Sequence, residues 1–336
     1  MSINNFDVNA AARKDSGVFG LPFSVEESEL VLIPVPWEVT TSYGGGTSRG
    51  PDAILQASKQ VDLFDADKGD FFKKGIAILD ESADVHAWND AGRMLAQKII
   101  AQEDDVTDEM FGKINAYSDQ LNQYVYAETK RLLSSGKKVG VVGGDHSVPF
   151  GAILAFLEKY PKMGVLHFDA HADMRNAYEG FEHSHASIMH NIIAKTSLQK
   201  LVQVGIRDFC EEEADLIKAH PERIKTFFDA DLSDAKMQGE SWDSLCDKIV
   251  AALPKEVYVS FDIDGLDPRF CPNTGTPVPG GLDWREALYL LKKVARSGRQ
   301  IIGFDLNEVS PGLSESEWDA NVGARLLYQL CGWVLT

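Results

Sequence analysis

The sequence has few cysteines and no long hydrophobic run. Its four cysteines lie far apart and form no Cys-x-x-Cys pair, so no disulfide framework is expected. No stretch of about 18 apolar residues is present, so no membrane span is expected. Met1–Asn5 has neither a basic n-region nor an apolar h-region, which predicts that no secretory signal peptide is present. We therefore expect a cytoplasmic protein.

Positive charge is also scarce. The chain carries 33 Lys and Arg against 51 Asp and Glu, which gives a formal net charge of −18. Such a balance argues against nucleic acid and anionic membranes as partners and is compatible with a cationic substrate. The 336 residues show no repeat, low-complexity tract or linker. We expect one domain over residues 1–336, with an N-terminal extension at 1–28 and a helical insertion at 82–133.

Short apolar segments alternate with helical patterns along most of the chain. The expected strands are Glu29–Pro34, Gly75–Leu79, Lys137–Val142, Gly164–Leu166, Leu201–Ile206, Arg223–Phe228, Glu256–Asp264 and Gln300–Val309. The polar insertion predicts one or two long surface helices. Alternation of this kind predicts an α/β protein in which helices cover both faces of a mainly parallel sheet, a three-layer α/β/α fold.

One motif follows the expected strand at Gly164–Leu166. Asp169, His171 and Asp173 are spaced two apart, and on an extended strand they would share one face. A carboxylate, an imidazole and a carboxylate placed in this way can bind a metal ion. An Asp-rich strand end can also simply cap the next helix, but two further polar clusters weaken that alternative.

Those clusters supply more metal ligands at the ends of two other strands. Asp262 and Asp264 are expected to share a face at the end of one strand, and His146 follows another. Functional side chains in parallel sheets gather beyond the carboxyl ends of the strands. Two imidazoles and four carboxylates suit Mn²⁺, with Ni²⁺, Co²⁺ or Fe²⁺ as alternatives. Six ligands shared by two ions leave room for a water that the ions activate as a nucleophile.

At these residues the sequence resembles the ureohydrolases, a family of arginases, agmatinases, other guanidino-compound hydrolases and formimidoylglutamases. The motifs that carry the resemblance are Gly-Gly-Asp-His-Ser at 143–147, Asp-Ala-His-Ala-Asp at 169–173 and Ser-Phe-Asp-Ile-Asp-Gly-Leu-Asp-Pro at 260–268. The resemblance extends over about residues 30–332. It implies an arginase-like fold, a binuclear manganese cluster, hydrolysis of a guanidinium or amidine carbon, and a homo-oligomer that is a trimer or hexamer.

The resemblance also implies roles for individual residues. The implied metal ligands are His146, Asp169, His171, Asp173, Asp262 and Asp264. His185 matches the proton-shuttling histidine, and Glu308 matches the carboxylate that binds the guanidinium; with Asp173, these form the expected catalytic set. Both roles are physically reasonable, because a carboxylate pairs with a guanidinium and a histidine transfers protons near pH 7. His183 and His190 match no family residue and are expected at the surface.

Within the family the sequence is most similar to agmatinases. Arg175 stands where arginases carry an Asn that holds the amino-acid end of arginine, which disfavours arginase. The expected substrate is agmatine, cleaved to putrescine and urea; guanidinobutyrate, guanidine, arginine and formiminoglutamate are alternatives. A non-catalytic ureohydrolase-like subunit is disfavoured because every ligand is present.

Residues expected to contact the substrate tail are Arg175, Asp208, Glu213 and Thr276. The acidic stretch from Asp208 to Glu213 would attract an amine tail, or it would only favour the start of a helix. Arg175 would either pair with that stretch or meet a substrate carboxylate, and these alternatives distinguish agmatine from guanidinobutyrate.

Overall fold

One eight-stranded sheet passes through the computed structural model, which describes residues 6–13, 15–312 and 317–336. Its strands are β1 (Leu30–Val35), β2 (Ile76–Ile78), β3 (Lys138–Gly143), β4 (Gly164–Phe168), β5 (Lys200–Ile206), β6 (Ile224–Phe228), β7 (Glu256–Asp262) and β8 (Gln300–Asn307). They are ordered β2-β1-β3-β8-β7-β4-β5-β6, and each neighbouring pair is parallel. The predicted parallel sheet is confirmed.

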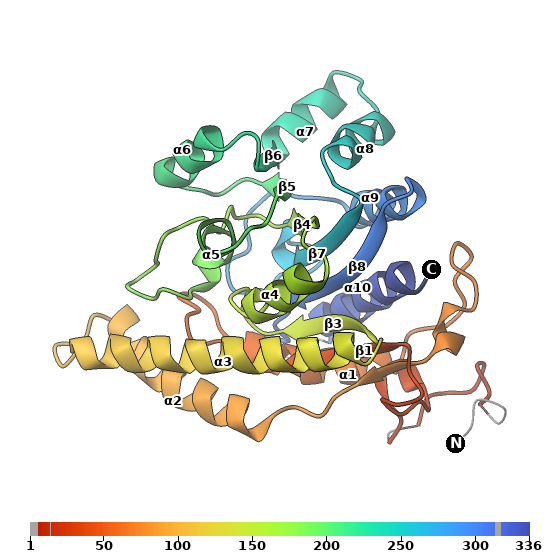
Figure 1. Ribbon diagram of the computed structural model, residues 1–336, viewed down its shortest axis with the longest axis horizontal. Helices are drawn as coiled ribbons and strands as arrows, with labels where there is room; N and C mark the ends of the chain where they lie inside the picture. Colours follow the sequence, from red (N-terminus) through yellow and green to blue (C-terminus); the bar gives the residue numbers. More distant parts are fainter. Residues whose placement is uncertain (1–5, 14, 313–316) are drawn as a thin grey trace.

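Helices cover both faces of this sheet (Figure 1). They are α1 (Gly50–Ser58), α2 (Ala83–Ile100), α3 (Asp108–Ser134), α4 (Phe150–Lys159), α5 (Ile188–Lys195), α6 (Glu211–Ala219), α7 (Asp229–Met237), α8 (Trp242–Ala251), α9 (Trp284–Arg296) and α10 (Trp318–Leu335). Side chains alternate along each strand, so Leu30 and Leu32 belong to a core cluster that includes residues of α1, α8, α9 and α10. Val31 and Ile33 belong to a second cluster, on the other face, that includes residues of α2 to α5. The three-layer arrangement is therefore also confirmed.

The polar insertion forms two helices, α2 and α3, which pack against each other. The side chain of Ser82 accepts a hydrogen bond from the Val85 backbone N–H at the start of α2, at 3.4 Å. The middle of α3 packs closely on α4, where Gly151 lies against the backbone of Asn122. The insertion is thus part of the helical layer on one face of the sheet.

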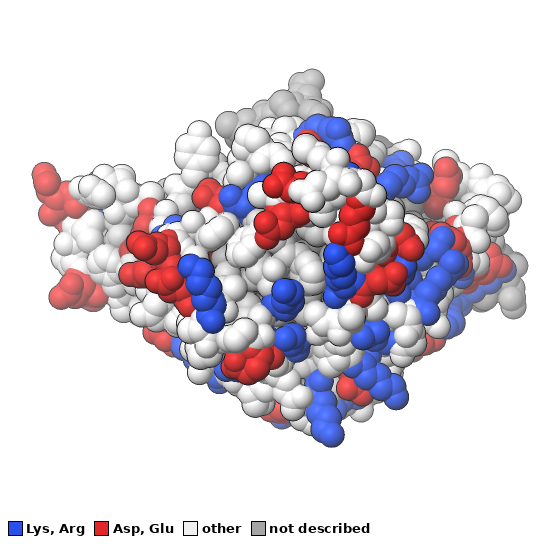
Figure 2. All heavy atoms as spheres, turned by 90° about the horizontal axis from the view of Figure 1, so that it is seen from above, with Lys and Arg blue, Asp and Glu red and all other residues white. Residues whose placement is uncertain are grey.

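The surface does not gather its charges into one region on the face that Figure 2 shows, where acidic and basic side chains are interspersed. Among the described residues, no helix has the length and hydropathy that a membrane span requires. The boundary of the expected N-terminal extension stays a prediction, since residues 1–5 and 14 lie outside the described residues.

At the candidate ligands the backbone leaves the extended conformation that the sequence predicts. β4 ends at Phe168, so Asp169, His171 and Asp173 follow the strand as a loop, in which Asp173 has a φ of 53°. β7 ends at Asp262, and Asp264 lies on a short 3₁₀ turn. The explanation of their proximity by a shared strand face is therefore wrong. A strand ends where its neighbours no longer form hydrogen bonds with it. Beyond that point the backbone bends, and the side chains of these residues turn toward one another.

Helix α7 was not predicted from the sequence. Its only buried residue is Leu232, so it lacks the apolar periodicity that would signal a helix. It follows β6 directly and packs on β5 and β6, which indicates that tertiary contacts stabilise it.

Two helical glycines give opposite predictions for stability. At Gly151 an added Cβ would lie 2.1 Å from the Asn122 carbonyl oxygen, whereas at Gly112 on α3 no atom lies within 4 Å. We expect Gly151→Ala to lower the free energy of unfolding by about 1–3 kcal/mol through overpacking. Gly112→Ala is expected to raise it by about 0.5–1 kcal/mol, since alanine favours a helix. Urea unfolding measures both, and equal effects would contradict the close packing of α3 on α4.

Candidate metal centre

The loops beyond four adjacent strands bring the polar residues together at one edge of the sheet. In the order β3-β8-β7-β4, His146 follows β3, Glu308 follows β8, Asp262 ends β7 and Asp169 follows β4. Because the strands are parallel, all four carboxyl ends lie at the same edge. The topology therefore collects residues that are far apart in the sequence.

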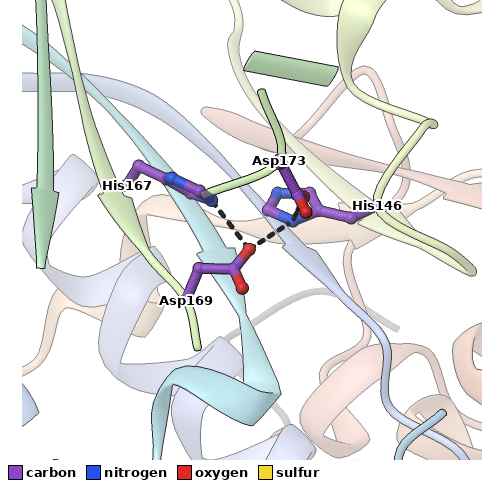
Figure 3. Close-up of side chains that lie close together, drawn as sticks. All are labelled: His146, His167, Asp169 and Asp173. Atoms are coloured by element: carbon purple, nitrogen blue, oxygen red, sulfur yellow. Dashed lines mark hydrogen bonds and ion pairs between the residues drawn. The ribbon is translucent and has the colours of Figure 1, made fainter. Parts of the chain in front are cut away.

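A first group surrounds the Nδ1 atom of His146. This atom lies 2.9 Å from Asp169 Oδ2 and 3.2 Å from the Oδ2 atoms of both Asp173 and Asp262. All four side chains are buried. Figure 3 shows Asp169 and Asp173 pointing toward the imidazole of His146. Three carboxylates converging on one imidazole nitrogen form a suitable set of ligands for a divalent cation.

A second group shares Asp169 with the first. His171 Nδ1 lies 3.1 Å from Asp264 Oδ2 and 3.5 Å from Asp169 Oδ1. Asp169 therefore presents one oxygen to each group. All six ligands expected from the sequence lie in these two groups, although the backbone that holds them differs from the predicted strand.

The electrostatics of the cluster indicate that it needs compensation by positive charge. Burial, followed by the negative charge of Asp169, raises the pKa of Asp173 to about 7. Burial and the neighbouring carboxylates Asp264 and Asp169 also raise the pKa of Asp262 well above its usual range. Burial opposes protonation of His146, but hydrogen bonds with Asp169, Asp173 and Asp262 outweigh it and raise its pKa. Without a cation the cluster must hold protons, and divalent ions would replace them. The donor set thus fits a metal.

Two residues of the site have strained backbone conformations. Asp173 has a φ of 53° and Glu308 a φ of 64°, values that residues other than glycine rarely adopt. The Asp173 carbonyl accepts hydrogen bonds from the N–H groups of Met189 and His190, at 3.0 and 3.1 Å. The Glu308 carbonyl accepts one from the Thr274 hydroxyl, at 2.8 Å. These contacts keep both side chains directed toward the cluster. The strained backbone itself costs about 1–3 kcal/mol for each residue.

The second nitrogen of His146 is held from behind the cluster. The Ser260 hydroxyl donates to Asp305 Oδ1 at 2.9 Å, so its oxygen accepts from His146 Nε2, also at 2.9 Å. With the proton on Nε2, the lone pair on Nδ1 faces the carboxylates. Such contacts behind a ligand select the tautomer that binds a metal.

His167 is a functional candidate that the sequence reasoning missed. Its Nδ1 accepts from the Gln203 side-chain amide at 3.1 Å, so Nε2 carries the proton and donates to Asp169 Oδ2 at 2.8 Å (Figure 3). His167 could join His146, Asp169 and Asp173 around an ion, but these hydrogen bonds make it a support for Asp169. Its position two residues before Asp169 was the signal available in the sequence.

Glu308 is buried and only partly satisfied. Its Oε1 accepts from the His146 backbone N–H at 2.9 Å, whereas Oε2 has no hydrogen-bond partner among the described residues. Burial and the negative charge of Asp145 raise the pKa of Glu308 well above its usual range. A buried carboxylate oxygen without a donor is a place where a cationic group with N–H donors would be bound.

His185 begins the turn that leads into α5. Its backbone N–H donates to the Thr40 hydroxyl at 3.1 Å, and its ring packs edge-on against Tyr178. Burial, with the nearby charge of His171, lowers the pKa of His185 to about 4. The imidazole is therefore neutral at pH 7.

The expected tail residues are engaged to different degrees. Arg175 Nε lies 3.9 Å from Glu213 Oε2, and its guanidinium lies over the Tyr178 ring, 4.9 Å from the ring centre. Both Glu213 oxygens accept backbone N–H groups, one from Met174 and one at the start of α6.

The other two tail candidates are both more accessible than the buried Glu213. Asp208 is exposed and Thr276 is partly buried. The helix-start interpretation of the acidic stretch therefore holds for Glu213, while Asp208 stays available to a ligand.

One histidine lies in a different environment from the one expected. His183 is 9% exposed and packs on Phe150, with ring centres 5.3 Å apart, so its surface assignment is wrong. The ring lies under α3, whose approach to this loop cannot be read from the local sequence. His190 is partly exposed.

Comparisons with known proteins match most of this chain to one family. The model of the arginase family matches residues 28–332. The N(1)-aminopropylagmatine ureohydrolase of Synechocystis sp. is 31% identical over 92% of this chain and 90% of its own length. The agmatinase of Bacillus subtilis is 28% identical over 91% of both chains. The structure of proclavaminate amidino hydrolase from Streptomyces clavuligerus shares the fold, with a TM-score of 0.74 at 24% identity, over 97% of this chain and 99% of the other.

The shared position of Asp169 predicts graded metal loss. Asp169→Asn should reduce the metal in both groups, because an amide is a weaker ligand than a carboxylate, whereas Asp264→Asn should remove about half. Asp215→Asn, at an exposed residue on α6, serves as the control and should retain the full content. Elemental analysis of folded protein measures the result, and full occupancy in Asp169→Asn would contradict the ligand assignment.

The raised pKa of Asp173 predicts how metal binding depends on pH. The folded-state value of about 7 lies above the usual value of about 3.9, so the metal-free protein should lose stability as the pH rises from about 4 to about 7. Metal and protons compete for the same carboxylates. We expect the rise in Tm on adding Mn²⁺ to be larger at pH 8 than at pH 5.5. A rise that is the same at both values would count against the cluster as the binding site.

Proposed function

This chain belongs to the arginase family and is a ureohydrolase, a hydrolase of carbon–nitrogen bonds, and from that premise we propose that it cleaves the guanidinium group of agmatine or of a closely related amine. The observation that carries the proposal is the unpartnered Oε2 of buried Glu308. A guanidinium is planar and permanently charged, and it would supply the N–H donors that this oxygen lacks.

We propose that the two groups sharing Asp169 hold two divalent ions. Mn²⁺ is the first choice for carboxylate and imidazole ligands, with Ni²⁺ or Co²⁺ as alternatives. When bound, the ions would lower the pKa of a water, which would then ionise more readily and become a stronger nucleophile toward the guanidinium carbon. Asp173 belongs to this site as a ligand and, through its position beside His146, as part of the catalytic set.

The residues of this chain would then divide the remaining work. Glu308 binds and orients the guanidinium so that its carbon faces the cluster. His185 would take the proton that the attacking water gives up and deliver it through its imidazole to the leaving amine. His167 and Ser260 keep Asp169 and His146 in their binding orientations.

The contacts of Arg175 support a substrate with an amine tail. Its guanidinium lies over the Tyr178 ring and near the Glu213 carboxylate, so it already has partners within the protein. Agmatine then fits better than guanidinobutyrate, whose carboxylate would need a free cation. Asp208 and Thr276 are the accessible residues proposed to meet the tail.

The relatives favour a second candidate of the same class. Several of them are named N(1)-aminopropylagmatine ureohydrolases, and one from Thermus thermophilus is 32% identical over 91% of this chain and 90% of its own length. Such a substrate carries one more amine than agmatine, so the net charge of −18 would also favour its approach. A cytoplasmic location and a trimeric or hexameric assembly remain part of the proposal.

A substrate panel tests the proposed activity. Urea release should be measured with agmatine, N(1)-aminopropylagmatine, guanidinobutyrate, arginine and guanidine, and formamide release with formiminoglutamate, each with Mn²⁺ and with Ni²⁺. We expect the highest kcat/KM for one of the first two compounds. A tenfold preference for arginine or formiminoglutamate would contradict the proposal, and a preference for bare guanidine would contradict the role given to the tail residues.

The variant His185→Ala, measured with the same substrates, tests the proposed role of His185 in proton transfer. Removing a general acid–base group typically lowers kcat by about 10²–10⁴-fold. The metal content should stay at the wild-type value, because His185 belongs to neither ligand group. An unchanged kcat between pH 6 and 9 would show that another group moves the proton.

A further inference from the structure

The α2–α3 insertion touches both segments that hold His185. One face of α2 meets the loop at residues 38–41. It carries Asn89 and the residues three and four positions later, Gly92 and Arg93. The Asn89 side-chain oxygen accepts from the Glu38 N–H at 2.8 Å. Gly92 allows close packing on Val39, since an added Cβ would lie 2.9 Å from a Val39 methyl group. Arg93 therefore lies on the same face as these two contacts.

Arg93 fixes the far end of this loop. Its Nη1 donates to the Thr41 carbonyl and, at 3.4 Å, to the Val39 carbonyl. The residue between these carbonyls, Thr40, is fully buried. A single guanidinium thus determines the backbone position on both sides of Thr40.

Thr40 connects this loop to the candidate catalytic residues. Its hydroxyl oxygen accepts from the His185 backbone N–H at 3.1 Å. The same hydroxyl lies 3.3 Å from Asp145 Oδ2 and donates to it, and Asp145 directly precedes His146 in the chain. The distance between His185 and the first ligand group therefore depends on where the loop holds Thr40.

Helix α3 contacts the segment just before His185 from the other side. Phe111 packs on Phe181, with ring centres 6.2 Å apart. The Asn115 side-chain oxygen accepts from the Glu182 N–H at 3.2 Å. One turn further along α3, Asp119 lies 3.5 Å from His183 Nε2. These three helix residues are spaced four apart and form one stripe.

We propose that the insertion clamps these two segments and so positions His185 over the metal ligands. Asn89, Gly92 and Arg93 hold the segment at 38–41, while Phe111, Asn115 and Asp119 hold the segment at 181–183. These are positioning residues, because they act on the reaction only through Thr40 and His185. The inference rests on the proposed function in one respect, the role of His185 as the proton carrier.

Arg93→Ala and Asn115→Ala test the clamp, with Lys113→Ala as the matched control. Lys113 lies on α3 between Phe111 and Asn115, and its ammonium pairs with the exposed Glu109. We expect kcat to fall by at least about tenfold in the two clamp variants, since a displacement near 1 Å can cost about 10²-fold. KM, metal content and Tm should stay close to those of Lys113→Ala. Arg93→Lys should recover part of the lost kcat, because an ammonium still donates to a carbonyl.

Amide hydrogen exchange of the metal-loaded protein gives a readout that does not need turnover. In Arg93→Ala we expect faster exchange at residues 38–41 and at the His185 N–H, with unchanged exchange in the sheet. Exchange that stays at the wild-type rate in these segments, or an unchanged kcat, would overturn the proposal. So would a loss of kcat that only parallels loss of metal or global unfolding. Failure of the wild-type protein to hydrolyse any compound of the panel would contradict the proposed function, whereas the exchange experiment would still decide whether the clamp exists.

Discussion

Mutual repulsion among buried carboxylates is the constraint on which this structure depends. Four aspartates and two histidines meet at the carboxyl edge of the sheet, and their charges cannot all persist there without compensation. The surrounding chain is arranged to keep them together, through strained backbone at Asp173 and Glu308 and hydrogen bonds from His167 and Ser260. A site that keeps these residues together despite charge repulsion and backbone strain is suited to binding divalent cations.

The scaffold explains why such distant residues can meet. Parallel strands place all their carboxyl ends at one edge, and the order β3-β8-β7-β4 brings the three strands that carry or precede the candidate ligands next to β8, which precedes Glu308. Helical layers bury both faces, so the edge is the place where polar side chains can reach a ligand. The α2–α3 insertion then adds contacts that reach around this edge to His185.

The sheet, the layers and the residues that cluster at its edge could be predicted because each depends on local pattern. Apolar runs mark buried parallel strands, and the Asp-Ala-His-Ala-Asp spacing at 169–173 marks a ligand cluster. The bend after Phe168 could not be predicted, because a φ of 53° at Asp173 is held by the distant N–H groups of α5. The same holds for the burial of His183 beneath α3.

The central claim is that two ions share Asp169. Crystals of the Mn²⁺-loaded protein, measured at the manganese absorption edge, test it most directly through anomalous difference maps. The account predicts two peaks, one among His146, Asp173 and Asp262 and one beside His171 and Asp264, with Asp169 contacting both. A single peak, or peaks away from these residues, would contradict it.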